Sequence, residues 1–133
     1  MTIFTKIAKG EIPSYKVAEN DEFYAFLDIN PLSKGHTLVI PKNVEDDYIF
    51  HLDDKTYEGL WKFAAKVAAA IKAAVPCQRV GVAVLGMEVP HTHIHLIPLQ
   101  TEGDMDFKKK RPEFTPEQQA QTAAAILKEY EKL

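Results

Sequence analysis

Three of the five histidines of this chain stand at every second position within the segment VPHTHIHLIPL, residues 89–99. Successive side chains of a β-strand point to opposite faces, and the backbone rises about 3.3 Å per residue. His91, His93 and His95 are therefore expected on one face of a strand, with the intervening residues facing the core. Such a strand needs a second layer over its apolar face, and a long helix is the layer expected here.

The segment over residues 53–75 supplies a helix of the required kind. Its apolar side chains recur at three- and four-residue steps, which produces one apolar stripe along a helix. The stripe consists of Leu60, Phe63, Ala64, Val67, Ala68, Ile71 and Val75. Asp53 or Asp54 is suited to cap the helix start, and Pro76 is expected to end it. Lysines occupy the opposite side, so the helix is expected to lie on a sheet.

The other elements are indicated by turn and capping residues. Strands are expected over residues 15–20, 21–29, 36–42, 79–86 and 89–99. A tight turn at 19–21 is expected to join the first two, and a hairpin that turns near 85–88 is expected to join the last two. Short and longer helices are expected over residues 2–10 and about 115–132, the second capped by Thr115 with Pro116 and Gln118 in its first turn. The order predicts an α+β fold, a five-stranded antiparallel sheet packed by a long central helix, with short N-terminal and longer C-terminal helices.

Length and charge limit the function classes. A chain of 133 residues with a net charge of −3 is expected to form a single domain over residues 1–133, with no nucleic-acid or membrane partner. The basic run Lys108–Arg111 is interpreted as a solvated loop. Cys77 is the only cysteine, which excludes an internal disulfide and a cysteine-based zinc cage. Charged side chains interrupt residues 1–13 too early for the apolar core of a signal peptide. The chain also has no apolar run long enough to span a membrane, so a cytoplasmic location is expected.

Three histidines in register allow three interpretations. They could be structural, they could bind a metal such as zinc, or they could act on a phosphate. In the last case one neutral imidazole attacks phosphorus while its neighbours donate hydrogen bonds to the phosphate oxygens. A metal site would need further ligands, and the sequence offers His36 and His51 without a carboxylate at a recognisable spacing. We therefore expect phosphate chemistry with no metal and no cofactor.

The segment HTHIHLI resembles the histidine triad signature of the HIT superfamily of nucleotide hydrolases and transferases, in which histidines alternate with apolar residues. Residues 3–42 are similar to the N-terminal half of the nucleotide-binding, phosphoramidase-like branch of that superfamily. The resemblance covers most of a triad core over residues 3–99, and it leaves the C-terminal helix and the loop before it unsupported. It implies a HIT-like fold and, as is common in the family, a homodimer.

The resemblance also implies roles for individual residues. His93 would be the nucleophile that forms a covalent nucleotidyl-histidine. His95 and His91 would hold the α-phosphate and orient the ring, and His36 would lie near the same phosphate. Asp28 would accept hydrogen bonds from the ribose hydroxyls. The apolar pocket for the base would consist of Ile3, Phe4, Ile7, Phe26 and Ile29. Without the resemblance, these apolar residues could be core and Asp28 could be a turn former.

The hairpin before the triad departs from the family pattern. The family usually carries an Asn and then Gly-Gln-Ser or Gly-Gln-Thr there, whose polar groups contact the phosphate and the leaving group. This chain keeps Gly86 but has Val84, Met87 and Glu88 at the other positions, and a carboxylate beside a phosphate repels it. Gly86, Met87 and Glu88 are still expected to line the nucleotide site. The Cys-x-x-Cys zinc site of some members is absent, because Thr2–Thr5 occupies its position.

These observations predict a hydrolase that cleaves a nucleoside 5′-monophosphate ester or amide, such as an adenosine 5′-phosphoramidate, through a nucleotidyl-histidine intermediate. The altered hairpin keeps an alternative open, a nucleotide-binding or regulatory module with little catalytic activity. A metal-binding protein that uses the three histidines is a third possibility.

Overall fold

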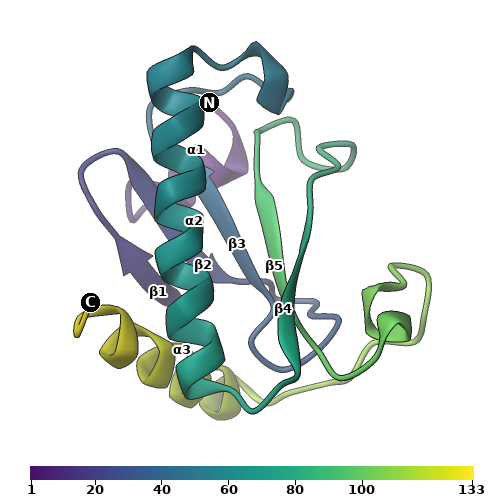
Figure 1. The fold of residues 1–133 in the computed structure, drawn as a ribbon. Helices are drawn as coiled ribbons and strands as arrows, with labels where there is room; N and C mark the ends of the chain where they lie inside the picture. Colours follow the sequence, from purple (N-terminus) through teal and green to yellow (C-terminus); the bar gives the residue numbers. More distant parts are fainter.

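The computed structural model of the protein describes residues 1–133 and shows one five-stranded antiparallel sheet with helices on both faces (Figure 1). The strands are β1 (Lys16–Glu19), β2 (Phe23–Leu27), β3 (Thr37–Pro41), β4 (Arg79–Ala83) and β5 (Ile94–Leu99), in the order β1-β2-β3-β5-β4. The helices are α1 (Ile3–Ala8), α2 (Asp54–Ala74) and α3 (Pro116–Tyr130), with short 3₁₀ turns η1 (Ile49–His51) and η2 (Glu102–Met105). The predicted α+β architecture is confirmed.

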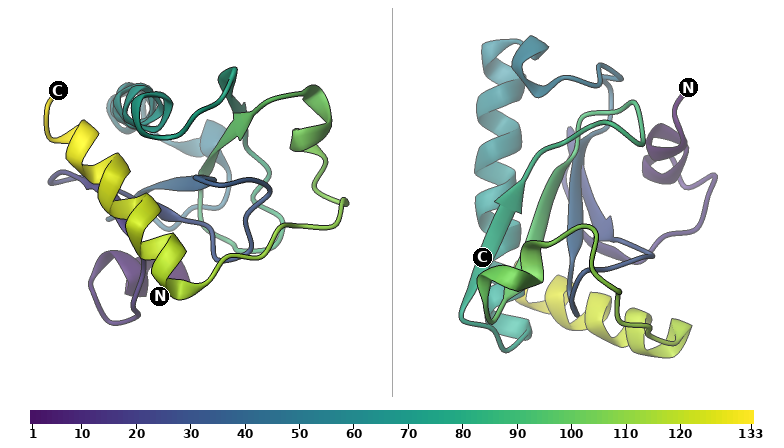
Figure 2. Two further views of the ribbon diagram at one scale, coloured as in Figure 1. Left: turned by 90° about the horizontal axis from the view of Figure 1, so that it is seen from below. Right: turned by 90° about the vertical axis from the view of Figure 1, so that its right-hand side faces the viewer.

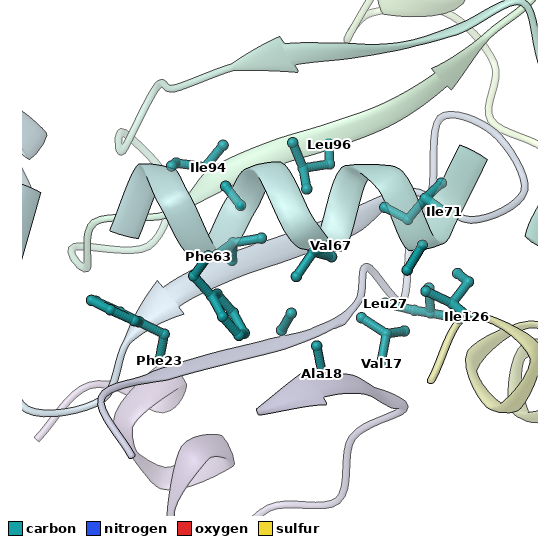
Figure 3. Packing of buried hydrophobic residues seen from close by; sticks show 14 of the residues in the cluster. Val17, Ala18, Phe23, Leu27, Phe63, Val67, Ile71, Ile94, Leu96 and Ile126 are labelled. Carbon is teal, nitrogen blue, oxygen red and sulfur yellow. The ribbon is translucent and has the colours of Figure 1, made fainter. Parts of the chain in front are cut away.

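Helix α2 lies along one face of the sheet, as its apolar stripe predicts. Its N-cap is Asp53, whose carboxylate accepts the N–H of Thr56 at 2.7 Å, and Val75 ends it. The stripe is buried except for Ala68, which is half-buried, and it packs against Ile94 and Leu96 of β5 (Figure 3). Full burial of each such aliphatic side chain stabilises the fold by about 1.5–3 kcal/mol.

Helix α3 begins as its sequence predicts and packs beside α2 and β1. The Thr115 hydroxyl accepts the Gln118 N–H at 3.1 Å, and the Gln118 side chain accepts the Thr115 N–H at 2.8 Å. Ile126 then joins the core cluster between α2 and the sheet (Figure 3). Helix α3 also contacts the loop that follows β2, where its Gln119 side chain bonds to the backbone of Asp28.

The opposite face of the sheet carries α1, and Figure 2 shows α1 and α2 on opposite sides of the strands. A second apolar cluster lies here, with residues that alternate along β2 and β3 with those of the first cluster. It consists of Phe4, Ile7, Tyr24, Phe26, Leu38 and Ile40. Leu38 pairs in register with His95 on β5, so the α1 face is also the histidine face.

The predicted strand over residues 89–99 and the predicted hairpin that turns near 85–88 are wrong in their bounds. Strand β5 begins only at Ile94, and the connection from β4 runs from Val84 to His93. Pro90 has no N–H for a strand ladder, and both the N–H and the hydroxyl of Thr92 donate to the carbonyl of Asp46, at 2.9 and 2.6 Å. Of the three alternating histidines, only His95 therefore lies on a strand.

No helix of this structure combines the length and the apolar character that crossing a membrane requires.

Candidate active site

A cavity of about 550 Å³ opens on the histidine face, between α1, the end of β2 and the connection before β5. It gathers most of the residues expected from the sequence. These are Ile3, Phe4, Ile7, Phe26, Asp28, Ile29, Gly86, Met87, Glu88, His93 and His95. His36 and His91 do not line the cavity, but each contacts a histidine that does: His36 bonds to His95, and the His91 carbonyl bonds to His93. A volume of this size is typical of sites for small molecules and cofactors.

His93 presents an unprotonated nitrogen to the cavity. Its Nδ1 lies 2.7 Å from the carbonyl oxygen of His91, and a carbonyl can only accept, so Nδ1 carries the proton. The lone pair is then on Nε2, which has no partner within the protein and keeps contact with solvent. The ring of Phe4 meets the His93 ring edge to face at 5.1 Å and fixes its orientation.

His95 presents the opposite group, an N–H donor, because a buried relay sets its tautomer. The backbone N–H of Leu32 donates to Nδ1 of His36 at 2.9 Å, which leaves the His36 proton on Nε2. That Nε2–H donates to Nδ1 of His95 at 3.0 Å, so His95 must carry its own proton on Nε2. The His93 and His95 rings are 4.8 Å apart between centroids. An acceptor and a donor thus stand side by side in one cavity.

His91 is fully buried, and both of its nitrogens bond to the protein. Nε2–H donates to the carbonyl of Pro41 at 3.0 Å, and the Thr2 hydroxyl donates to Nδ1 at 2.7 Å. Direct contact with a phosphate, expected from the resemblance, is therefore not available to His91. Its carbonyl is the group that orients His93.

Burial keeps the four histidines of the site neutral near pH 7. It lowers the pKa of His36 to about 3 and the pKa of His95 to about 4, in each case chiefly by desolvation. Desolvation also lowers the pKa of His93 and that of His91. A neutral His93 is the form that can attack an electrophile.

Asp28 serves both as a turn former and as a wall of the cavity. One carboxylate oxygen accepts the N–H of Asn30 at 2.8 Å, and the other lies 3.7 Å from Nε2 of His36. The Gln119 amide of α3 donates to the Asp28 carbonyl at 3.1 Å and ties this loop to α3. Burial raises the pKa of the Asp28 carboxyl, with the Asn30 contact acting against it.

The apolar residues divide between core and exposed wall. Phe4, Ile7 and Phe26 are buried members of the second cluster and also line the cavity. Ile3 and Ile29 are 50% and 84% exposed, so they are not core residues. Side chains this exposed beside a cavity leave apolar surface available to a ligand.

In the connection between β4 and β5, the backbone at Gly86 shapes the cavity wall more than polar side chains do. Gly86 has a φ of +72°, and a Cβ there would lie 2.7 Å from the carbonyl oxygen of Asp47, so only glycine fits. Met87 is 91% exposed. Glu88 is exposed at the rim of the cavity and is close enough to raise the pKa of His93 slightly against the effect of burial.

Nine residues of the cavity wall were not expected from the sequence, and two of them, Phe107 and Arg111, bear on the chemistry of the site. Phe107 packs its ring against that of His95 at 5.1 Å, and Arg111 lines the cavity beside it. Arg111 belongs to the basic run interpreted as a solvated loop, and only the return of the chain after β5 brings it to the histidines. No local pattern indicated this contact.

The structure does not bring the three alternating histidines together as metal ligands, because the nitrogens of His91 are engaged elsewhere. A different group, Asp28, His36 and His95, places one possible ligand atom each within 4.8 Å of one another. The hydrogen bond between His36 and His95 accounts for the shortest of these separations.

Comparison with known proteins agrees with this geometry. The family model described as "HIT domain" matches residues 9–102. An uncharacterised HIT-like protein of Borreliella burgdorferi is 42% identical over 114 residues, which cover 80% of this chain and 81% of that protein. The adenosine 5′-monophosphoramidase of Saccharomyces cerevisiae is 39% identical over 102 residues, 75% of this chain and 63% of the yeast protein.

A solved structure of a Hit-like protein from Bartonella henselae is similar over 96% of this chain and 95% of that one, with a TM-score of 0.80 and 31% identity. The relatives and the family match support a role in nucleotide hydrolysis or nucleotide binding. The matched residues include the β2 end, the hairpin and all four histidines of the site. This chain belongs to the HIT family.

Proposed function

We propose that the protein hydrolyses a nucleoside 5′-monophosphate amide or ester, with an adenosine 5′-phosphoramidate as the preferred type of substrate. The observation that carries the proposal is the pairing of a free Nε2 lone pair on His93 with an Nε2–H donor on His95. The relative from yeast that is named a phosphoramidase adds support.

In the first step, Nε2 of His93 forms a bond to the α-phosphorus, and the bond from phosphorus to the leaving nitrogen or oxygen breaks. The leaving group takes up a proton from solvent. The Nδ1–H of His93 stays bonded to the carbonyl of His91, which stabilises the positive charge that the ring acquires. In the second step, water attacks phosphorus and loses a proton to solvent. The bond to His93 breaks, its electron pair returns to Nε2, and the nucleoside monophosphate is released.

His95 is proposed to stabilise the transition state without giving up its proton. Its Nδ1 already accepts from His36, so loss of the Nε2 proton would leave a buried anion. A preorganised donor of this kind contributes about 10²–10³ in kcat. His36 and His91 are positioning residues, which hold His95 and His93 respectively.

The remaining wall residues are proposed to bind the nucleoside. Asp28 accepts hydrogen bonds from the ribose hydroxyls. The base lies against the apolar part of the wall, and Gly86, Met87 and Glu88 border the phosphate. The base contacts are assigned to Ile3, Phe4, Ile7, Phe26 and Ile29.

The test compares wild type with His93→Ala on a fluorogenic AMP amide. His51→Ala is the matched control, because His51 is an exposed histidine outside the cavity. We expect the His93 variant to lose turnover and the His51 variant to keep it. Full turnover by His93→Ala would end the proposal.

The exposed Met87 favours a second candidate, a nucleotide-binding module with little catalysis, because a thioether is a poor donor to a phosphate or leaving group. Single-turnover mass spectrometry separates the two candidates. An AMP adduct on His93 supports the enzyme, whereas tight AMP binding without an adduct supports the module.

The proposal includes one HIT domain over residues 1–133, α3 included, located in the cytoplasm and assembled as a homodimer. The edge strand β4 supports the dimer, since its outer side is unpaired and Val82 is 49% exposed. Light scattering of wild type and Val82→Glu tests it. A wild-type monomer at micromolar concentration would contradict it.

A further inference from the structure

The loop between β5 and α3 is held by hydrogen bonds and an ion pair, and it returns the chain to the cavity. Asp104 accepts the backbone N–H groups of Gln100 and Thr101, at 2.8 and 3.0 Å, and its other oxygen lies 3.6 Å from Nζ of Lys109. This turn directs the following residues back over β5, where Phe107 packs on His95. Phe107 and the rest of the loop after residue 102 lie outside the family match.

Arg111 is anchored at the end of this loop without an acidic partner. Its two terminal nitrogens donate to the carbonyls of Asn30 and Phe107, and the guanidinium carbon lies 5.8 Å from the Phe107 ring centroid. No carboxylate lies within ion-pair distance of Arg111. The two backbone contacts use only part of its five N–H donors, so others are free for a ligand.

Arg111 is also the only cationic side chain in the cavity wall. The wall contains two carboxyl groups, Asp28 and Glu88, and its histidines are neutral near pH 7. A bound phosphate group therefore finds a single fixed positive charge in this cavity. The planar guanidinium fork matches the geometry of phosphate oxygens, and its charge does not depend on pH in the physiological range.

We propose that Arg111 is a phosphate-binding residue, which pairs with the charged α-phosphoryl oxygens of the nucleotide while His95 donates from the adjacent side. This inference rests on the proposed function, since it names the group that neutralises the substrate of the same site. Phe107 and the Asn30 carbonyl hold the guanidinium in place. The loop after β5 is then part of the active site.

The test measures binding of AMP and of adenosine by titration calorimetry, because the two ligands differ only in the phosphate. Arg111→Gln removes the charge, Arg111→Lys keeps it, and Lys110→Gln removes the same charge from an exposed neighbour outside the cavity wall. We expect Arg111→Gln to lower the preference for AMP over adenosine by about 10- to 100-fold, with adenosine affinity unchanged. Arg111→Lys should keep part of the preference and Lys110→Gln all of it.

Ionic strength gives a readout that a merely structural role would not change. The preference of wild type for AMP should fall as salt is raised, whereas that of Arg111→Gln should be nearly independent of salt. Equal weakening of AMP and adenosine, or an unchanged preference, in Arg111→Gln would overturn the assignment and leave the proposed hydrolase standing. A wild-type protein that binds neither ligand would overturn both.

Discussion

Replacement of His36 by leucine tests the relay that fixes the donor of the active site. His36 is completely buried and makes two hydrogen bonds, one from the Leu32 N–H and one to Nδ1 of His95. Leucine leaves both partners unsatisfied, and each buried unsatisfied group costs about 1–3 kcal/mol. We therefore expect the free energy of unfolding to fall by about 2–6 kcal/mol. His36→Gln should lose less, because its amide can accept from Leu32 and donate to His95.

The activity of the same variants separates tautomer control from stability. In His36→Leu, His95 is free to move its proton to Nδ1, so a lone pair instead of a donor faces the phosphate. Loss of one preorganised donor should lower kcat by about 10²–10³, with KM little changed. The assay uses the AMP amide at a temperature where urea unfolding shows the variant to be folded, and His36→Gln should recover much of the rate. A folded His36→Leu protein with kcat within about twofold of wild type would refute the relay.

Three further predictions follow from burial and backbone geometry. Burial lowers the pKa of His36 to about 3 and that of His95 to about 4, so the unfolded chain binds more protons than the folded one below about pH 6.5. The urea midpoint of unfolding should therefore fall steadily from pH 6.5 to pH 4, and a constant midpoint would contradict the neutral relay. Gly86→Ala should destabilise the hairpin and weaken AMP binding in calorimetry, because φ is positive and Asp47 leaves no room for a Cβ; unchanged binding would count against this. Leu60→Ala should cost about 2–5 kcal/mol in urea unfolding and the exposed Lys66→Ala less than about 0.5 kcal/mol, and similar losses for both would reject the α2 packing.

The elements that the sequence predicts best are those whose signals are local. The period of the α2 stripe, the Asp53 cap and the Thr115 capping box depend on residues within a few positions of one another, and all three are confirmed. The side of the sheet that carries the histidines is also predictable, because Ile94 and Leu96 of β5 alternate with His95 and lie in the core.

The features that the sequence could not indicate depend on distant partners. Strand β5 starts late because Thr92 bonds to Asp46, far away in the chain, and nothing in the alternation of residues 89–99 announces that contact. His91 is withdrawn from the cavity by Thr2 and Pro41 in the same way. Equal spacing therefore suggested that all three histidines face one site, whereas only His93 and His95 line the cavity.

The residues of the cavity wall could likewise not be assigned from the sequence. Apolar residues near the N-terminus were open to a core or a ligand-binding interpretation, and Phe4 proves to contact both the core and His93. A basic run is usually solvated, and only the fold reveals that Arg111 reaches the histidines while its neighbour Lys110 stays exposed. Neither the amino-acid composition nor the spacing of apolar residues indicates contacts between residues this far apart in the chain.

The most direct test of the central claim is rapid quenching of a single turnover of the AMP amide, followed by mass spectrometry of the digested protein. Attack by Nε2 of His93 predicts a transient AMP adduct on the peptide that contains His93, formed before free AMP appears and absent from His93→Ala. Turnover with the adduct on another residue, or with no adduct under conditions that trap phosphohistidine, would contradict the account.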